Sequence, residues 1–290
     1  MRTLRTLFIV ALAGLAACTA ANITLPPVTD QPTGAHIPGK VIWHDLLTDD
    51  VESARHFYGE LFGWKFESPT PGQNSAYTLI TLNGSRIGGM IDATKIRADV
   101  DLTQWVSILS VDDVDAATEL VRTSGGTVFT EPTNLTDRGR ISVVADSQGA
   151  LVALLRTEGG DPQDQEPEIG GFLWDELWTD DPNQSIDFLS ELVAYEGNTV
   201  AIEGEDYRYL SSAGQPRVGI RKNPLPGLTP TWVTFIRVED PAAITARVEE
   251  LGGKVFVEAQ TNRIGGQVAI IADPAGAGLV IQSWTPRERT

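Results

Sequence analysis

The hydrophobic pattern of residues 41–66 changes its period twice, and each change marks the boundary of a predicted element. Side chains alternate from Val41 to Thr48 with the period of a β-strand, and two aspartates end this run. From Val51 to Leu61 the apolar residues share one helical face, with an aspartate in the N-cap position before it. Gly63 ends the helix, and Trp64 starts another strand. The pattern therefore predicts a strand–helix–strand unit of about thirty residues.

The acidic start of this helix recurs three times later in the chain. The four copies are Thr48–Ala54, Val111–Ala117, Thr179–Ser185 and Val238–Ile244. Each copy follows a short alternating strand, and its acidic residues can accept hydrogen bonds from the free N–H groups of the first helical turn. Two copies place a proline at the first helical position, where no N–H is needed: Pro182 and Pro241. We therefore expect four similar modules.

The four modules fall into two pairs. The first and third share W-x-[DE]-L and F-x-x-E-L, whereas the second and fourth share W-V, G-G-x-V-F and A-D-x-x-G. This alternation predicts two similar domains, residues 39–157 and 170–286, joined by a charged Gly/Pro linker at residues 158–169. Each domain has about 120 residues, the usual size of a domain with its own core.

The order of these elements resembles a known superfamily. A strand, an acid-capped helix that ends in F-Y-x-x-L-F-G-W, three further strands and D-x-x-G before the last strand resemble the vicinal oxygen chelate superfamily. That superfamily includes glyoxalase I, extradiol dioxygenases and bleomycin-resistance proteins. The resemblance implies an α+β fold of four βαβββ modules, paired into two tandem domains with cupped mixed sheets. Because one fold carries many functions, the resemblance says little about which reaction or ligand this chain has.

The first residues have the pattern of an export signal. Arg2 and Arg5 precede an uncharged run that is too short to span a membrane, so residues 1–17 are predicted to be a signal peptide. Leu15 to Cys18 resembles a bacterial lipobox, which would make Cys18 the lipidated first residue of the mature chain. Cys18 is the only cysteine, so no intrachain disulfide can form, and lipidation would explain an odd thiol in an exported protein.

The proline-interrupted segment 18–38 would then be a tether to the membrane, with His36 as a solvated residue. We expect an exported, membrane-anchored lipoprotein. Thr19 is not the aspartate associated with inner-membrane retention, which favours the outer membrane or its periplasmic face. The formal net charge of −17 and the lack of a basic cluster argue against nucleic acid as a partner. The oligomeric state is left open.

The residues at the metal positions of the superfamily are unsuitable in this chain. Metal-using relatives take a His or Gln from the first strand of a module and a Glu from the last, and alignment on the helices puts these positions on Trp43 and on apolar residues. The apolar positions are Val106, Ala153, Val233 and Val280, with Gly88, Gly89 and Gly219 in the strands between. Such side chains cannot hold a divalent cation, so no cofactor is predicted.

His44 is the one residue that could restore a metal site. Alternation along the strand places Trp43 and Asp45 on the cup face and His44 on the opposite face. A register error of one residue would reverse this, so a divalent metal held by His44 is the alternative. The chain has only three histidines, in a tether, a strand and a helix, which argues against the two-His, one-carboxylate site of an extradiol dioxygenase.

What remains is a cup with aromatic walls and one acid in each domain. The predicted ligand-binding residues are Trp43, Asp45, Tyr77, Trp174, Glu176, Trp178 and Tyr207. They would suit a small molecule with an apolar or cationic ring and a hydrogen-bond donor. The same residues also fit an ordinary aromatic core with acids at its rim, and the sequence does not separate these interpretations.

Three functions are compatible with this pattern. The first is an envelope-anchored protein that binds a small molecule without a metal. The second is a lyase or isomerase in which Asp45 or Glu176 is the general base, with or without a metal. The third is an envelope protein whose cups are vestigial and whose surface binds another protein.

Overall fold

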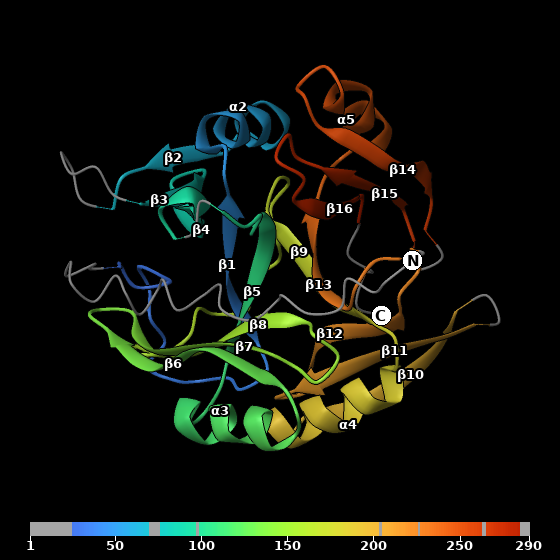
Figure 1. Ribbon diagram of the computed structural model, residues 1–290. Coiled ribbons are helices and arrows are strands. Elements are labelled where there is room, and N and C mark those ends of the chain that lie inside the picture. Colours follow the sequence, from blue (N-terminus) through green and yellow to red (C-terminus); the bar gives the residue numbers. More distant parts are fainter. Residues whose placement is uncertain are drawn as a thin grey trace, which may run out of the picture.

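A computed structural model of the chain describes residues 25–69, 76–96, 99–202, 205–225, 227–262 and 265–284 (Figure 1). The expected signal peptide, Cys18 and the beginning of the expected tether lie outside these residues. No helix among the described residues is long and apolar enough to cross a membrane.

The described chain contains the predicted modules. The first domain comprises β1 (Val41–Thr48), α2 (Val51–Phe62), β2 (Lys65–Glu67), β3 (Tyr77–Leu82), β4 (Ser85–Asp92), the 3₁₀ turn η2 (Ala93–Lys95), β5 (Gln104–Ser110), α3 (Val114–Thr123), β6 (Thr127–Leu135), β7 (Gly139–Ala145) and β8 (Leu151–Thr157). The second comprises β9 (Phe172–Thr179), α4 (Pro182–Val193), β10 (Glu196–Ile202), β11 (Glu205–Ser212), β12 (Gln215–Lys222), β13 (Thr231–Arg237), α5 (Pro241–Val248), β14 (Lys254–Thr261), β15 (Gln267–Ala272) and β16 (Gly278–Gln282).

Each domain is one eight-stranded mixed sheet. The strand orders are β2-β3-β4-β1-β5-β8-β7-β6 and β10-β11-β12-β9-β13-β16-β15-β14, so the two sheets share one topology. The two modules of a sheet join through an antiparallel pair, β1 with β5 and β9 with β13. The predicted α+β fold of paired modules in two tandem domains is confirmed.

The predicted acidic residues start the helices. Each helix follows an aspartate whose side chain accepts hydrogen bonds from backbone N–H groups of the first turn: Asp50, Asp113, Asp181 and Asp240. Gly63 ends α2 in the left-handed conformation, with φ of 74°, and this reverses the chain into β2. These local features fix where each helix lies on its sheet.

The two faces of each sheet have different neighbours. The outer face carries the helices and packs against the other domain: Leu46 and Phe57 of the first module share a core with Ile271 of the fourth, and Val152 of the second module shares one with Leu210 of the third. Accordingly α2 lies beside α5 and α3 beside α4 (Figure 1). The opposite face, called the cup face below, has a separate core made from one domain only.

A buried polar pair joins the outer faces of the two sheets. His44 of β1 places Nε2 3.0 Å from Asp175 Oδ1 of β9, and both side chains are buried. Asp175 Oδ1 also accepts hydrogen bonds from Ser107 at 2.8 Å and Thr234 at 3.1 Å. His44 and Asp175 hold equivalent positions in the first and third modules, as Ser107 and Thr234 do in the second and fourth. The repeated strands therefore meet on a local pseudo-twofold axis.

A second equivalent pair connects each domain to the start of the other. Trp64 Nε1 donates a hydrogen bond to the carbonyl of Gly170 at 2.7 Å, and the Tyr195 hydroxyl donates one to the carbonyl of Gly39. Both glycines have positive φ, 84° and 87°. A Cβ atom on Gly39 would collide with the Tyr195 ring, so glycine is needed at this position.

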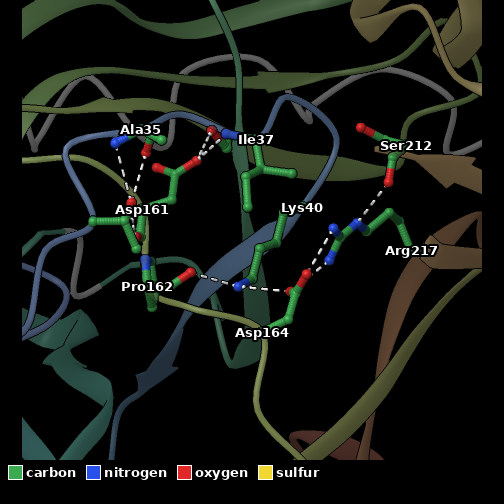
Figure 2. A network of polar contacts seen from close by, with 10 residues as sticks. Ala35, Ile37, Lys40, Asp161, Pro162, Asp164, Ser212 and Arg217 are labelled. Atoms are coloured by element: carbon green, nitrogen blue, oxygen red, sulfur yellow. Dashed lines mark hydrogen bonds and ion pairs between the residues drawn. The ribbon is translucent and has the colours of Figure 1, made fainter. Parts of the chain in front are cut away.

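The linker between the domains is also held by polar contacts (Figure 2). Asp164 accepts a hydrogen bond from Arg217 at 2.6 Å and lies 2.9 Å from Lys40 Nζ, which lowers the pKa of Asp164 to about 2. The Asp161 carboxylate accepts a hydrogen bond from the backbone of Ile37 at 2.7 Å. The charged Gly/Pro segment therefore has a fixed path.

We predict that His44→Ala lowers the free energy of unfolding by about 3 kcal/mol, because it leaves Asp175 buried with a missing partner. Urea unfolding measures this. His56→Ala is the matched control, since His56 is exposed on α2 and should change stability by no more than about 0.5 kcal/mol. Equal stability of the two variants would contradict the role assigned to the buried pair.

Candidate functional site

Three predicted residues of the first domain meet on its cup face. Trp43 Nε1 lies 2.9 Å from Asp45 Oδ1 and 3.0 Å from the Tyr77 hydroxyl, and the hydroxyl donates to the same carboxylate oxygen at 2.8 Å. A Cβ atom on Gly89 of β4 would collide with both Tyr77 and Asp45. Glycine at that position therefore makes room for the acid and its two donors. His44 points the other way, as strand alternation predicts.

The second domain repeats this arrangement with one more indole. Trp174 Nε1 donates to the Tyr207 hydroxyl at 2.9 Å, and the hydroxyl donates to Glu176 Oε1 at 2.8 Å. Trp178 Nε1 donates to the other carboxylate oxygen of Glu176 at 2.7 Å. Gly219 of β12 is equivalent to Gly89, since a Cβ atom on Gly219 would collide with Tyr207 and Glu176.

Burial changes the pKa of the carboxyl group in each cup, Asp45 in the first and Glu176 in the second. It raises the pKa of Asp45, against the opposing effects of Arg138 and of the hydrogen bonds from Tyr77 and Trp43. Burial likewise raises the pKa of Glu176, opposed by the Trp178 hydrogen bond and by the charge of Arg221. Each carboxyl group is thus less acidic than a solvated one.

The first cup is covered by the segment before β1. Val28 is 3% exposed and packs in the same core as Trp43 and Tyr77. The segment is held at its other end, where His36 Nε2 lies 2.8 Å from the carbonyl of Thr157. His36 is half-buried, so its prediction as a solvated tether residue is wrong. Residues 25–38 lie against the domain because Val28 removes apolar surface from water.

The second cup is less covered than the first at its Trp and Tyr positions, whereas its acid is more covered, since Asp45 is half-buried and Glu176 is buried. Trp43 is 2% exposed and Tyr77 5%, whereas Trp174 and Tyr207 are only half-buried. Ile270, on the cup face of β15, is also half-buried, in contrast to the buried Val143 of the first domain. The two predicted sites therefore share their polar arrangement but differ in access.

The cups do not have a donor set that fits the metal of the superfamily. Ala153 and Val280, at the positions where the resemblance implied a glutamate, are buried apolar residues of the two cup cores. Asp45 Oδ1 and both carboxylate oxygens of Glu176 already accept hydrogen bonds from Trp and Tyr side chains. His44, the alternative ligand, is bound to Asp175 on the outer face. Within the described residues, no three His, Cys, Asp or Glu side chains are grouped to hold a metal ion.

The comparisons with known proteins identify the family. The model of the Glyoxalase/Bleomycin resistance protein/Dioxygenase superfamily matches residues 40–154. CFP32 of Mycobacterium tuberculosis, which bears the provisional name glyoxylase, is 30% identical over 248 residues that cover 85% of this chain and 95% of that protein. The chain belongs to this superfamily.

Other relatives extend the comparison. The anthracycline biosynthesis protein DnrV of Streptomyces peucetius is 29% identical, over 84% of this superfamily member and 93% of DnrV. The Mn(II)-bound glyoxalase from Novosphingobium aromaticivorans superposes with a TM-score of 0.58 at 16% identity, covering 85% of this chain and 82% of that one. An extradiol ring-cleaving dioxygenase from B. fuscum gives 0.59 at 12% identity, covering 89% and 75%. The likeness to these two solved structures, at 16% and 12% identity, shows the fold alone.

Sequence reasoning missed two residues that determine access to the first cup. Val28 lies in a proline-interrupted segment without periodicity, and Arg138 follows a turn residue, Asp137, with a positive φ of 63°. Arg138 is 2% exposed and lies over the Trp43 ring at 4.8 Å. An arginine before a glycine in a polar turn is usually a solvated residue, so the pattern gave no indication of burial.

We predict that Asp45→Asn raises the free energy of unfolding at pH 7 by about 1 kcal/mol, because the amide removes a charge that desolvation disfavours. Since the pKa of Asp45 is raised in the folded chain, the stability contribution of this carboxyl is complete below its ordinary value of 3.8 and is lost as pH rises through the raised pKa. The Asn side chain keeps an oxygen for Trp43 and Tyr77 and removes the charge.

The advantage of Asp45→Asn should therefore disappear as the pH falls toward about 4, as measured by urea unfolding across pH. Asp49→Asn, at an exposed position just after β1, is the control and should show no such pH dependence. If Asp45→Asn is less stable than the wild type at pH 7, the ionised carboxylate is favoured in this site and the prediction is wrong.

Proposed function

We infer that this superfamily member binds a small molecule on the cup face of its second domain, without a metal. The observation that carries this proposal is the difference in access between the two cups: the acid, indole and phenol recur, but Trp174 and Tyr207 are half-buried where Trp43 and Tyr77 are covered. Half-buried aromatic side chains held by hydrogen bonds are pre-organised surfaces for a ligand.

The arrangement favours a flat ring system as the ligand. Trp174 and Tyr207 provide the surfaces for stacking, while Glu176 fixes Tyr207 and Trp178 from behind. Glu176 is 1% exposed, so its role in this proposal is to position the aromatic groups. The name of DnrV supports a polycyclic aromatic ligand, since anthracyclines are molecules of this kind.

A lyase or isomerase is the second candidate. The raised pKa of Glu176 favours it, because a general base works best with a pKa near the operating pH. Both oxygens of Glu176 already accept hydrogen bonds, which favours binding over proton abstraction. If the chain is an enzyme of this kind, Glu176→Gln would abolish turnover of a bound substrate while the substrate still binds.

We predict that Trp174→Leu weakens the binding of an anthracycline with a protonated amino sugar at least about tenfold, a loss of about 1.4 kcal/mol of stacking energy. Quenching of tryptophan fluorescence measures the affinity. Trp43→Leu is the matched control in the covered cup and should leave the affinity unchanged. Loss of binding in both variants would argue against the second cup as the site.

The metal-free part of the proposal is tested in the same titration. Dialysis against a chelator should change neither the melting temperature nor the affinity, because the described residues offer no donor set to a cation. Stoichiometric Zn, Ni, Mn or Fe that is removed together with thermal stability would contradict it.

We further infer that the chain is an exported lipoprotein anchored through Cys18, on the support of its signal and lipobox pattern. We predict that Cys18→Ser moves the protein from the membrane fraction to the soluble fraction of the cell. Membrane association that is unchanged in this variant would contradict lipidation at Cys18.

A further inference from the structure

Arg138 is a buried cation without an ion-pair partner among the described residues. It lies directly before β7, is 2% exposed, and has no described carboxylate within 4.0 Å of its guanidinium. No described residue accepts a hydrogen bond from its Nε. Burial of an arginine usually requires a full set of acceptors, because the desolvated charge is costly.

The contacts that Arg138 does make leave part of the guanidinium unused. It lies over the rings of Trp43 and Tyr77, at 4.8 and 5.9 Å, and Nη2 donates a long hydrogen bond of 3.3 Å to the Tyr77 hydroxyl. The hydroxyl in turn donates to Asp45. This chain of contacts holds the cation in place, yet it offers no pair of oxygens to the guanidinium fork.

Arg138 lines a hollow of about 270 Å³ between the first domain and the segment before β1. One wall is formed by residues 27–32 and another by residues 157–160, and the segment is held there by Gly34 N, which donates to the Gly159 carbonyl at 3.0 Å. Pro27, Val28 and Pro32 make the first wall apolar. Apolar side chains and Arg138, whose Nε has no hydrogen-bond partner among the described residues, therefore line the same hollow.

We propose that this hollow binds a small organic monocarboxylate, with the carboxylate on Arg138 and the apolar body against residues 27–32. A guanidinium matches a carboxylate with two parallel hydrogen bonds, which supplies the missing acceptors. Asp137 and Glu158 also line the hollow and are exposed, so they disfavour a dianion such as phosphate. The volume is at the lower end for ligand sites, which restricts the body to about one ring.

This site is independent of the proposed function, because it belongs to the first domain and one of its walls is a segment outside the repeated modules. In this proposal residues 27–32 contact the ligand, in addition to linking the beginning of the chain to the first domain. A ligand held between residues 27–32 and Arg138 contacts both, and it stabilises the folded state by an amount that rises with the logarithm of its concentration above the Kd.

The test is a calorimetric titration of the full chain with benzoate, with benzamide as the neutral analogue of the same shape. We expect saturable benzoate binding, at least about tenfold weaker binding of benzamide, and at least about tenfold weaker benzoate binding by Arg138→Gln, the loss typical of a charge-assisted pair. Arg140→Gln is the matched control. Arg140 follows Arg138 by two positions and pairs with Asp115 on the surface. This variant should therefore bind benzoate as the wild type does.

A second variant keeps the test decisive if Arg138→Gln does not fold. Thr29→Trp fills the hollow from its wall and leaves Arg138 in place, so it should abolish benzoate binding. Equal affinities for benzoate and benzamide, or undiminished benzoate binding by Thr29→Trp, would overturn the proposal. So would failure of benzoate to bind the wild-type chain.

Discussion

The arrangement of the molecule depends on the buried contact between His44 and Asp175. The contact joins equivalent strands of two repeated domains, and Ser107 and Thr234 complete it from the neighbouring strands. A carboxylate that has lost its water needs all of these donors, so the two sheets must lie with their outer faces together. The consequence is that each cup faces away from the other domain and has its own core. The two cups can therefore differ without disturbing the contact between domains.

The two cups share their hydrogen-bonded acid, indole and phenol groups but differ in how far the aromatic side chains are covered. The acid with its indole and phenol donors is present in both domains, and Gly89 and Gly219 make room for it in equivalent strands. Among the described residues, Val28 and Arg138 close over Trp43 in the first domain, whereas Trp174 of the second domain is half-buried. Because the polar arrangement recurs in both domains and the exposure of the aromatic side chains differs, we propose that the two domains have different roles. The hydrogen-bonded aromatic groups would serve as a rigid support in the first cup and as a contact surface in the second.

Most of the fold could be predicted from local patterns. The acids that start the helices, the reversal at Gly63 and the alternation that separates His44 from Trp43 depend on a few neighbouring residues, so a single sequence is enough to find them. The partner of His44 could not be predicted this way, because Asp175 lies in the other domain and no periodicity connects the two. The burial of Val28 and Arg138 also depends on contacts between distant segments. A comparison of equivalent positions would have indicated Asp175, since it holds in the third module the place of His44 in the first.

We propose that an aromatic ligand of the polycyclic kind contacts the second cup and leaves the first cup untouched. The most direct test is a ¹H–¹⁵N spectrum of the indole N–H groups of the seven tryptophans, recorded while an anthracycline is added. We expect the resonance of Trp174 to shift progressively and the resonance of Trp43, hydrogen-bonded beneath Arg138, to stay in place. A shift of Trp43 with an unmoved Trp174 would contradict it.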